Sequence, residues 1–477
     1  MEKSTKTKTN SNMNIGYIVF MTIVAALGGI LFGYDTAVIS GTTEMVRNQF
    51  ALSSMREGWY VGCALIGSIC GVAVAGAMSD KLGRKRTMLI SAALFSISAI
   101  GCAVCGNFDQ LVIYRIIGGV GIGIVSIVSP IYISEVSPAK VRGTLVSLYQ
   151  LAVTMGFLLA YMANWMIDSG IDPALAASGE ELSLWQRMFN TEAWRGMLGS
   201  ETLPALLFFA IIFFIPESPK WLVVNQRLAQ AARVYSRIYR SEADVKAEIA
   251  ATNESMDGEN KCSWRDLLKP GILKAVIIGS AIAILGQFMG VNAVLYYGPK
   301  IFSDAGFTDP MFSTVLVGVV NMVTTILAVF IIDRVGRKQL IYWGVSGMII
   351  CLVAIATYFQ WGSAIGLGNG FMLTFFLAYV FCCAISISAI VFVLLSEMYP
   401  NSVRGRAMSI AGFALWIGTY LIGQLTPVLL GWSPAGTFLL FAAMCVPYML
   451  IMWRLVPETT GRSLEEIEAY WNKQNKK

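Results

Sequence analysis

The sequence contains no histidine and few charged residues. None of its 477 residues is histidine, and only 13% are charged, about half of the share usual in a soluble domain. Because histidine is the commonest metal ligand and titrates near neutral pH, its absence excludes histidine-ligated metal sites. It also leaves carboxylates as the side chains that can carry a proton. No nucleophile–base pair or metal-ligand cluster is visible, so the sequence predicts neither an enzyme nor a bound cofactor.

Long apolar runs fill most of the chain instead. Hydrophobic residues make up 56% of the sequence. They form runs of about 20 residues, long enough to cross a hydrocarbon core roughly 30 Å thick. The pattern excludes a single water-soluble core and predicts an all-α membrane protein with twelve transmembrane helices. We expect the spans near residues 16–40, 57–78, 87–106, 110–133, 145–167, 195–215, 272–298, 311–332, 339–359, 371–395, 407–430 and 435–456.

The basic residues gather on one side of the predicted bilayer. An even number of spans puts both termini on the same side. If that side is the cytoplasm, the tails and inner loops hold 29 of the 35 Lys and Arg residues, and Arg115 lies within a span. Short cytoplasmic loops are enriched in Lys and Arg, so this split predicts cytoplasmic termini. The net charge of +6 therefore reflects membrane orientation, and no nucleic-acid partner is predicted. The five basic residues of the outer loops are Arg47, Arg56, Arg187, Arg195 and Lys300.

Three short motifs occur twice in the same order. The pairs are Asp80–Lys85 with Asp333–Lys338, Ser134–Gly143 with Ser396–Gly405, and Pro216–Ser218 with Pro457–Thr459. Each copy falls at the inner end of the second, fourth or sixth span of its half. Repeats in register predict two parallel, pseudo-symmetric six-helix bundles, the arrangement of the major facilitator fold. We expect an N-terminal bundle over 1–215, a cytoplasmic linker with short helices over 216–270, a C-terminal bundle over 271–457 and a cytoplasmic tail over 458–477.

The repeated motifs carry acidic as well as basic residues. Membrane orientation alone explains the basic residues but not the recurring acids. Acidic and basic side chains at inner helix ends can pair across neighbouring helices and across the two bundles. We expect such pairs to latch the inner face while a central site opens outward, and to break when it opens inward. The predicted cytoplasmic gate consists of Asp80, Arg84, Glu135, Arg142, Glu217, Asp333, Arg337, Glu397, Arg404 and Glu458.

Three charged residues lie inside predicted spans. Asp35, Arg115 and Glu201 all fall towards the outer ends of spans in the N-terminal bundle, where they can meet. A charge at mid-bilayer costs roughly 2.5–3.5 kcal/mol on insertion scales, so such residues point to a function. An acid whose protonation depends on a movable arginine is a workable proton carrier. The alternatives are a static ion pair, or an Asp35 that caps a helix end.

The seventh span has the composition of a broken helix. Its glycines and proline, within residues 286–299, predict the break, and carriers bind substrate at broken helices near the membrane midplane. The same stretch holds Gln287, Asn292 and Tyr296. Amides and phenols offer hydrogen bonds without a counter-charge, which suits a neutral polyhydroxylated ligand. The alternative is that each polar side chain only joins neighbouring helices.

Taken together, these features resemble the sugar porter family of the major facilitator superfamily, from Gly29 to about Glu468. The motifs that carry the resemblance are Leu31–Thr36, Asp80–Arg86, Pro130–Glu135, Pro216–Leu222 and Pro457–Thr459. The resemblance implies a monosaccharide:proton symporter that works by alternating access. It implies that Asp35 accepts the proton, with Arg115 and Glu201 as its charge partners. It further implies sugar contacts from Phe32, Gln150, Gln287, Asn292, Tyr296, Asn321 and Trp416.

The chain departs from the family pattern in its C-terminal half. The family has two adjacent glutamines in the seventh span, where this chain has Gly286 before Gln287. The family's Gly-Pro-x-x-Trp stretch is absent from the tenth span, and Ile387 stands where some members carry a sugar-stacking tryptophan. A glutamine that some members carry before Trp416 is Leu415. The loss of two amides and an indole disfavours xylose or glucose and favours a differently shaped or less hydroxylated ligand.

Other functions stay open at this point. A passive facilitator would use Asp35 only structurally. A membrane sugar sensor would need a longer cytoplasmic tail than the residues after Pro457 provide. The sugar porter motifs disfavour a drug exporter. The expected partners are a small neutral sugar or polyol and the lipid bilayer, with a proton as the coupling ion and a monomer as the functional unit. The expected location is a bacterial inner membrane, because the outer loops lack an Asn-x-Ser/Thr sequence.

Overall fold

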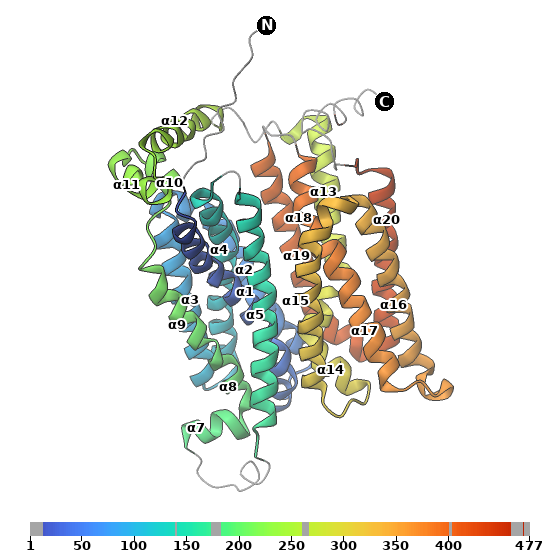
Figure 1. Cartoon of the computed structure of the whole chain (residues 1–477). Coiled ribbons are helices and arrows are strands. Elements are labelled where there is room, and N and C mark those ends of the chain that lie inside the picture. The colour runs from blue at the N-terminus through green and yellow to red at the C-terminus, as the bar shows by residue number, and fades with distance from the viewer. Residues whose placement is uncertain are drawn as a thin grey trace.

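The computed structural model describes residues 13–138, 141–172, 183–259, 267–399, 403–458 and Trp471, and this part of the chain is mainly helical (Figure 1). The N-terminal half contains α1 (Ile15–Gln49), α2 (Ser54–Leu82), α3 (Arg84–Val104), α4 (Phe108–Val136), α5 (Arg142–Ser169), α7 (Leu184–Gln186), the π-helix η1 (Arg187–Thr191), α8 (Ala193–Ser200) and α9 (Thr202–Ile212). The central helices are α10 (Pro219–Val224), α11 (Leu228–Ile238) and α12 (Glu242–Glu259). The C-terminal half contains α13 (Pro270–Phe288), α14 (Val291–Asp304), α15 (Pro310–Val335), α16 (Arg337–Ile365), α17 (Asn369–Cys383), the π-helix η3 (Ala384–Ser388), α18 (Ala389–Met398), α19 (Arg404–Trp432) and α20 (Pro434–Arg454).

Twelve helical segments of the described chain are long and apolar enough to cross a membrane, which confirms the predicted number of spans. Three of these spans are interrupted. The sixth consists of α8 and α9, the seventh of α13 and α14, and the tenth of α17, η3 and α18. Breaks of this kind expose backbone groups, so a chain tolerates them in a membrane only where protein or a water-filled cavity surrounds them.

The first helix is longer than its apolar run. Asn14 caps it by accepting a hydrogen bond from the backbone N–H of Tyr17, and the helix then continues to Gln49. Thr42 and Thr43, beyond the predicted end of the span, are buried against neighbouring helices. Asp35 therefore lies near the middle of α1. The helix is thus longer than the predicted span of residues 16–40, because hydropathy marks the apolar run and not the whole helix.

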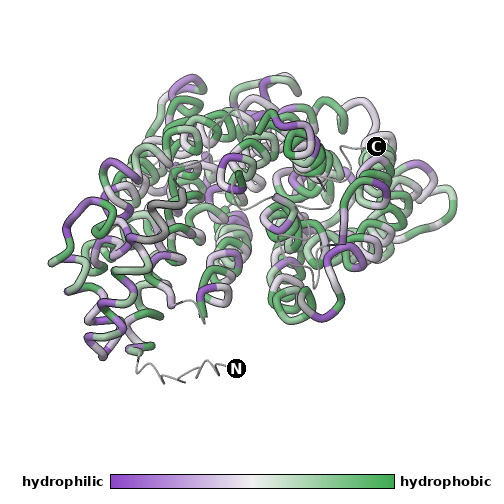
Figure 2. The backbone as a smooth tube through the Cα atoms, turned by 90° about the horizontal axis from the view of Figure 1, so that it is seen from above, coloured by the Kyte–Doolittle hydropathy of each residue, from purple (hydrophilic) through white to green (hydrophobic). Residues whose placement is uncertain are grey.

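The spans form two bundles that stand side by side. Figure 1 shows the helices from α1 to α9 in one bundle and those from α13 to α20 in the other, and Figure 2 shows the two groups from above. The central helices lie across one end of the N-terminal bundle. α11 buries Ala231, Val234, Tyr235 and Ile238, which share one helix face. The backbone N–H of Asn14 donates to the carbonyl of Ile238 across 2.9 Å, which joins α11 to the start of α1.

The two ends of the bundles carry different segments of the chain. We name the end that carries the repeated motifs and the central helices the basic face, and the other end the opposite face. The basic face is at the top of Figure 1, and α7 and the end of α14 are at the bottom.

Glycines let α2 and α4 approach closely in the N-terminal bundle. A Cβ atom on Gly119 would lie 2.0 Å from the carbonyl oxygen of Ala64, and one on Gly67 would lie 2.3 Å from that of Ile116. Small residues at such crossings allow backbone contact between membrane helices. The glycines at these crossings therefore serve helix packing.

Candidate functional site

The three charged residues of the N-terminal bundle meet in its interior. Nη1 of Arg115 on α4 donates to Oδ1 of Asp35 on α1 across 2.7 Å, and both side chains are almost fully buried. Glu201, in the turn between α8 and α9, is 2% exposed and interacts with both. The hydroxyl groups of Tyr34 and Ser200, 2.6 Å apart, join α1 to α8 beside this triad. The structure thus brings together the residues that the sequence predicts to meet.

The triad has one cation for two carboxyl groups. Within the described chain, Oδ2 of Asp35, Oε1 of Glu201 and Nε of Arg115 have no hydrogen-bond partner. An uncompensated buried charge costs several kcal/mol, so two ionised carboxylates beside one arginine are unfavourable. One proton shared between the two carboxyl groups makes the triad electrically neutral. The arrangement can therefore bind and release a proton when its surroundings change.

An aromatic pair joins the two bundles close to the triad. The rings of Phe32 on α1 and Trp416 on α19 have centroids 5.9 Å apart and are inclined by 35°. Phe32 lies one helical turn before Asp35. Because one ring comes from each bundle, a ligand held at this pair contacts both halves of the protein.

The seventh span is broken, as its sequence predicts. α13 ends at Phe288 and α14 begins at Val291, with Gly290 between them at a φ of +93°. A Cβ atom on Gly290 would lie 2.3 Å from the ring of Phe441. Both the backbone conformation and the space therefore require glycine at the break.

A polar cluster lies at this break. Oε1 of Gln287 accepts hydrogen bonds from Nδ2 of Asn292 across 2.5 Å and from Oγ1 of Thr419 across 3.2 Å. Sequence reasoning missed Thr419. The signal that could have found it is its position three residues after Trp416, which places both side chains on one face of α19.

The other predicted sugar contacts differ in their surroundings. Gln150 on α5 is exposed within a membrane span, and Asn321 on α15 is partly buried. Neither side chain forms a hydrogen bond with the described residues. Tyr296 on α14 is buried and packs near Gly423 of α19, where a Cβ atom would lie 3.6 Å from its ring. Tyr296 therefore contributes to helix packing, whereas Gln150 has free hydrogen-bonding capacity.

Two departures from the family pattern are neighbours in space. A Cβ atom on Gly286 would lie 3.5 Å from Cγ2 of Ile387 and 3.9 Å from the ring of Tyr448. Both are ordinary contact distances, so the corner has room for a side chain at position 286. The hydroxyl of Tyr448 is buried and has no hydrogen-bond partner among the described residues. Where the family has an amide and an indole, this chain thus has Ile387 and the ring of Tyr448 beside position 286.

Arg84 organises the motif residues at the basic face of the N-terminal bundle. Its Nε and Nη2 donate to the two carboxylate oxygens of Glu135, each across 3.0 Å. Its Nη1 donates to the carbonyl of Ser79 across 3.0 Å and to Asp80 across 3.2 Å. The hydroxyl of Ser218 also donates to Glu135, across 2.5 Å. A bidentate arginine–carboxylate pair of this kind has a defined geometry as well as strength.

Glu217 caps the N-terminus of α3. Its carboxylate accepts from the backbone N–H groups of Arg84, across 2.8 Å, and Lys85, across 3.1 Å, where the helix dipole favours negative charge. Burial raises the pKa of Glu217, and the backbone N–H groups act in the opposite direction. Gly83 precedes α3 at a φ of +96°, and a Cβ atom there would lie 2.3 Å from the Glu217 carboxylate. The cap therefore depends on glycine at position 83.

The second copy of the motif repeats this arrangement in the C-terminal bundle. Nη2 of Arg337 donates to Glu397 across 3.0 Å, and Nζ of Lys338 donates to the carbonyl of Val456 across 2.8 Å. Gly336 precedes α16 at a φ of +97°. The sequence repeat is thus a structural repeat.

The remaining gate residues are placed as follows. Glu458 follows α20 and is partly buried, and Arg404 begins α19. Nε and Nη2 of Arg404 have no hydrogen-bond partner within the described residues. The side chain of Asp333 lies outside the described residues. The gate pairs named above lie within one bundle each, so pairing across the bundles at this face stays a prediction.

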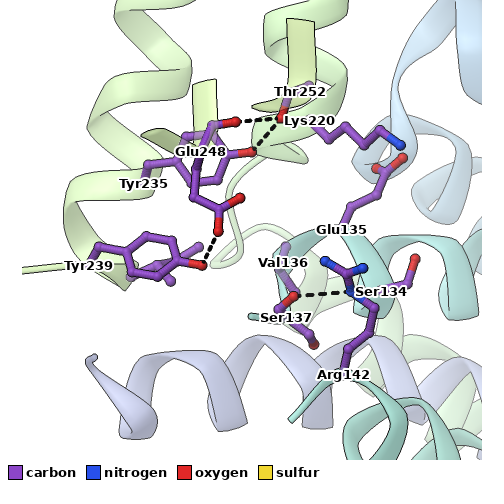
Figure 3. A pocket seen from close by; sticks show the side chains of 11 residues that line it. Ser134, Glu135, Val136, Ser137, Arg142, Lys220, Tyr235, Tyr239, Glu248 and Thr252 are labelled. Carbon is purple, nitrogen blue, oxygen red and sulfur yellow. Dashed lines mark hydrogen bonds between the residues drawn. The ribbon is translucent and has the colours of Figure 1, made fainter. Parts of the chain in front are cut away.

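A polar cavity of about 110 Å³ lies behind the N-terminal gate residues, between the ends of α4 and α5 and the central helices (Figure 3). Glu135 and Arg142 line it, and Nε of Arg142 donates to the carbonyl of Ser137 across 3.4 Å. From the other side, Glu248 accepts a hydrogen bond from Tyr239 across 2.9 Å. The cavity therefore connects the gate with α11 and α12.

Polar contacts join the two bundles near the opposite face. The hydroxyl of Tyr161 on α5 donates to the carbonyl of Leu295 on α14 across 2.9 Å. Nε2 of Gln424 on α19 donates to the carbonyl of Met55, at the start of α2, across 2.9 Å. The backbones meet at Gly58, where a Cβ atom would lie 2.0 Å from the carbonyl oxygen of Gln424. These contacts hold the bundles together at the opposite face.

Comparison with known proteins identifies the family. A family model described as "Sugar (and other) transporter" matches residues 21–471. The chain belongs to this family. Among its relatives, the D-xylose-proton symporter of Escherichia coli is 38% identical, with 98% of each chain covered, which confirms the resemblance seen in the motifs. The arabinose-proton symporter of Bacillus subtilis is 36% identical over 99% of this chain and 100% of the relative.

Solved structures agree with this assignment. The inward open conformation of the xylose transporter XylE from E. coli matches with a TM-score of 0.80 at 35% identity, over 95% of this chain and 100% of that one. XylE bound to 6-bromo-6-deoxy-D-glucose matches with a TM-score of 0.77 at 37% identity, over 96% and 100%. This sugar transporter therefore has the major facilitator fold. It is a multi-pass inner-membrane protein and not an enzyme.

Proposed function

We propose that this sugar transporter carries a monosaccharide together with a proton, by alternating access to a site between the two bundles. Relatives named as arabinose-, D-xylose- and galactose-proton symporters support this proposal. The observation that carries it is the buried triad of Asp35, Arg115 and Glu201, which lies one helical turn from the aromatic pair of Phe32 and Trp416. Movement of the bundles at that pair can change the surroundings of the triad and hence whether the triad holds a proton.

The proposed sugar site uses groups from both bundles. Phe32 and Trp416 offer aromatic faces to the C–H faces of a sugar ring. Gln287, Asn292 and Thr419 offer hydrogen bonds at the helix break, and the exposed amide of Gln150 faces no protein partner among the described residues. A small neutral sugar or polyol suits this set, because it needs many hydrogen bonds and no counter-charge.

One coupled proton is energetically sufficient. A proton that moves down a potential of about 100 mV and one pH unit releases roughly 3.7 kcal/mol. This supports about 500-fold accumulation of a neutral sugar. We further propose that the basic face is cytoplasmic, that the proton is the only coupling ion, and that a monomer suffices because one chain supplies both bundles.

Replacing Asp35 tests the coupling. Asp35→Asn mimics the protonated acid permanently, so sugar should still exchange across the membrane in a counterflow assay. Accumulation against a gradient should vanish, together with sugar-induced alkalinisation of the medium. Asp109→Asn is the control, because Asp109 is an exposed acid in the first turn of α4, away from the triad. It should leave both activities unchanged.

Two results would contradict the proposal in different ways. If Asp35→Asn still accumulates sugar, the coupling acid lies elsewhere and Glu201 is the next to test. If the unaltered protein moves no protons with any sugar, the transporter is a passive facilitator. A panel of labelled pentoses, hexoses, deoxysugars and inositols, assayed in transport-deficient cells, identifies the substrate.

A further inference from the structure

The basic residues of the opposite face are few, and the structure gives each of them a partner. Arg187 and Arg195 bind the carboxylate of Glu192, the former across 2.6 Å. The guanidinium of Arg56 lies 5.1 Å from the ring centre of Phe108. The other two, Arg47 and Lys300, converge on the single carboxylate of Glu57.

Glu57 is a fully buried acid whose partners come from both bundles. It lies in the first turn of α2, in the N-terminal bundle, and its side chain has no exposed surface. Nζ of Lys300, on α14 of the C-terminal bundle, donates to its Oε1 across 2.8 Å. Nη1 of Arg47, at the end of α1, lies 3.5 Å from its Oε2, which accepts no hydrogen bond from the described residues. Lys300 is thus the close partner, and Arg47 is a second, looser one.

The two cations behave differently if the bundles separate. Lys300 then moves away from Glu57 together with the C-terminal bundle. Arg47 belongs to the same bundle as Glu57 and stays beside it. A buried carboxylate without a partner costs several kcal/mol, but Arg47 is 41% exposed and can close on Glu57 as water enters. Asp304, the last residue of α14, lies near both cations, so the acids and bases of this cluster balance. The contact can therefore break and re-form without leaving a buried charge unpaired.

The helix that carries Lys300 also carries part of the proposed sugar site. Asn292, which bonds to Gln287, lies eight residues before Lys300 on α14, or about 12 Å along the helix axis. The break at Gly290 separates α14 from α13, and Tyr297 interrupts the helical conformation within α14. A displacement of Asn292 by a ligand can therefore reach Lys300 through one short helix.

We propose that Glu57 and Lys300 form the outer lock of this transporter, and that Arg47 takes over Glu57 when the lock opens. Lys300 is then a positioning residue: it holds α14 against α2 and closes the site to the outer side. The inference rests on the proposed function for the direction of access, but the contact itself depends on neither sugar nor proton.

The test measures access to the contact between the bundles. Val61 on α2 is buried, and its Cγ1 would lie 3.6 Å from a Cβ atom on Gly423 of α19. Val61→Cys reports opening through its reaction with a membrane-impermeant maleimide added from the outer side. Cys70, which is exposed, is first replaced by Ser. Labelling is measured without sugar and without a proton gradient.

Lys300→Met should raise the rate of labelling at position 61 of the Val61→Cys protein about tenfold, which corresponds to about 1.4 kcal/mol. The maximal rate of sugar counterflow should fall while equilibrium sugar binding is retained. Lys300→Arg keeps the charge and should label like the parent. Arg187→Met is the matched control, because it breaks an ion pair of the same face that lies within one bundle.

Several results would overturn the lock. One is a monodisperse Lys300→Met protein that labels at the parent's rate, and another is an Arg187→Met protein that labels just as fast. If Lys300→Met does not fold, Glu57→Gln with Lys300→Met removes both charges together, and it should label faster than the parent. If that double variant is labelled at the same rate as the parent, the proposal is rejected. Failure to transport any sugar would reject the proposed function and leave the labelling result intact.

Discussion

The amide of Gln287 is held in one orientation by its neighbours. Its Oε1 accepts hydrogen bonds from Asn292 and Thr419, so the two N–H donors of its Nε2 are left for a ligand. A fixed donor binds a ligand hydroxyl with little loss of side-chain freedom. The corner at Gly286 has no such group, since Ile387 is apolar and Tyr448 offers a single hydroxyl.

Adding amides to the C-terminal half should change the substrate preference. We predict that the unaltered protein binds xylose and glucose poorly, and that Gly286→Gln with Leu415→Gln improves the binding of one of them. Each restored hydrogen bond is worth roughly 0.5–1.5 kcal/mol, so about a tenfold gain in affinity is expected for the pair. Equilibrium binding of both sugars to the purified proteins checks this.

A volume-conserving change provides the control for this pair. Leu415→Met should leave both affinities unchanged, because it adds no hydrogen-bonding group. Uptake of xylose at micromolar concentration by the unaltered protein would show that the departures from the family pattern do not weaken the site.

At the scale of the element, the start of α3 shows how a motif residue serves local structure. The chain turns from α2 into α3 at Gly83, and the Glu217 carboxylate fills the space where a side chain would stand. Glu217 in turn precedes α10, so the cap ties the central helices to the membrane bundle. The gate residues therefore stabilise the local fold in addition to forming the network of ion pairs.

Substitution of this glycine should destabilise the N-terminal bundle. Gly83→Ala forces an L-residue into an extended backbone conformation with positive φ, at a cost of roughly 1–3 kcal/mol, and pushes Glu217 off the helix N-terminus. We expect a lower apparent melting temperature in detergent. Gly76→Ala is the control, because Gly76 lies inside α2 with nothing within 4 Å of its added Cβ atom. That change should be neutral or stabilising, and equal losses in the two variants would contradict the role of Gly83.

At the scale of the whole molecule, the two bundles are in direct contact near the opposite face. Phe32 and Trp416 lie at the central end of the contact, and Gly58 meets Gln424 nearer the opposite face. If the bundles rock about the central site, the contact at Gly58 must open in each transport cycle. A side chain inserted there acts on the cycle and not on the ligand.

A wedge at Gly58 should therefore block closure. Gly58→Leu places a side chain where even a Cβ atom would lie 2.0 Å from a backbone oxygen, and overpacking of this kind costs roughly 1–3 kcal/mol. We expect the transport rate to fall about tenfold or more while equilibrium sugar binding is retained. Gly370→Leu in the first turn of α17 is the control, since nothing lies within 4 Å of that position. Normal transport by Gly58→Leu would show that this contact does not move.

The sequence by itself determined the number of spans, the two repeated bundles and the break in the seventh span. These follow from local rules: apolar length decides whether a segment spans the membrane, and glycine at position 290 permits a conformation that other residues avoid. The motifs also pointed to Asp35, Arg115 and Glu201, because a charge within an apolar run is visible without a structure.

Only the tertiary structure decided which other side chains meet. The partnership of Glu57 with Lys300 joins residues far apart in the chain, and no local pattern marks Glu57 as buried. Thr419 likewise becomes part of the polar cluster only because α19 packs beside the broken helix. The full length of α1 was not visible in the sequence either, since the helix continues to Gln49, beyond its apolar run. Hydropathy describes how each segment meets the lipid, whereas the contacts between segments depend on the geometry of both bundles.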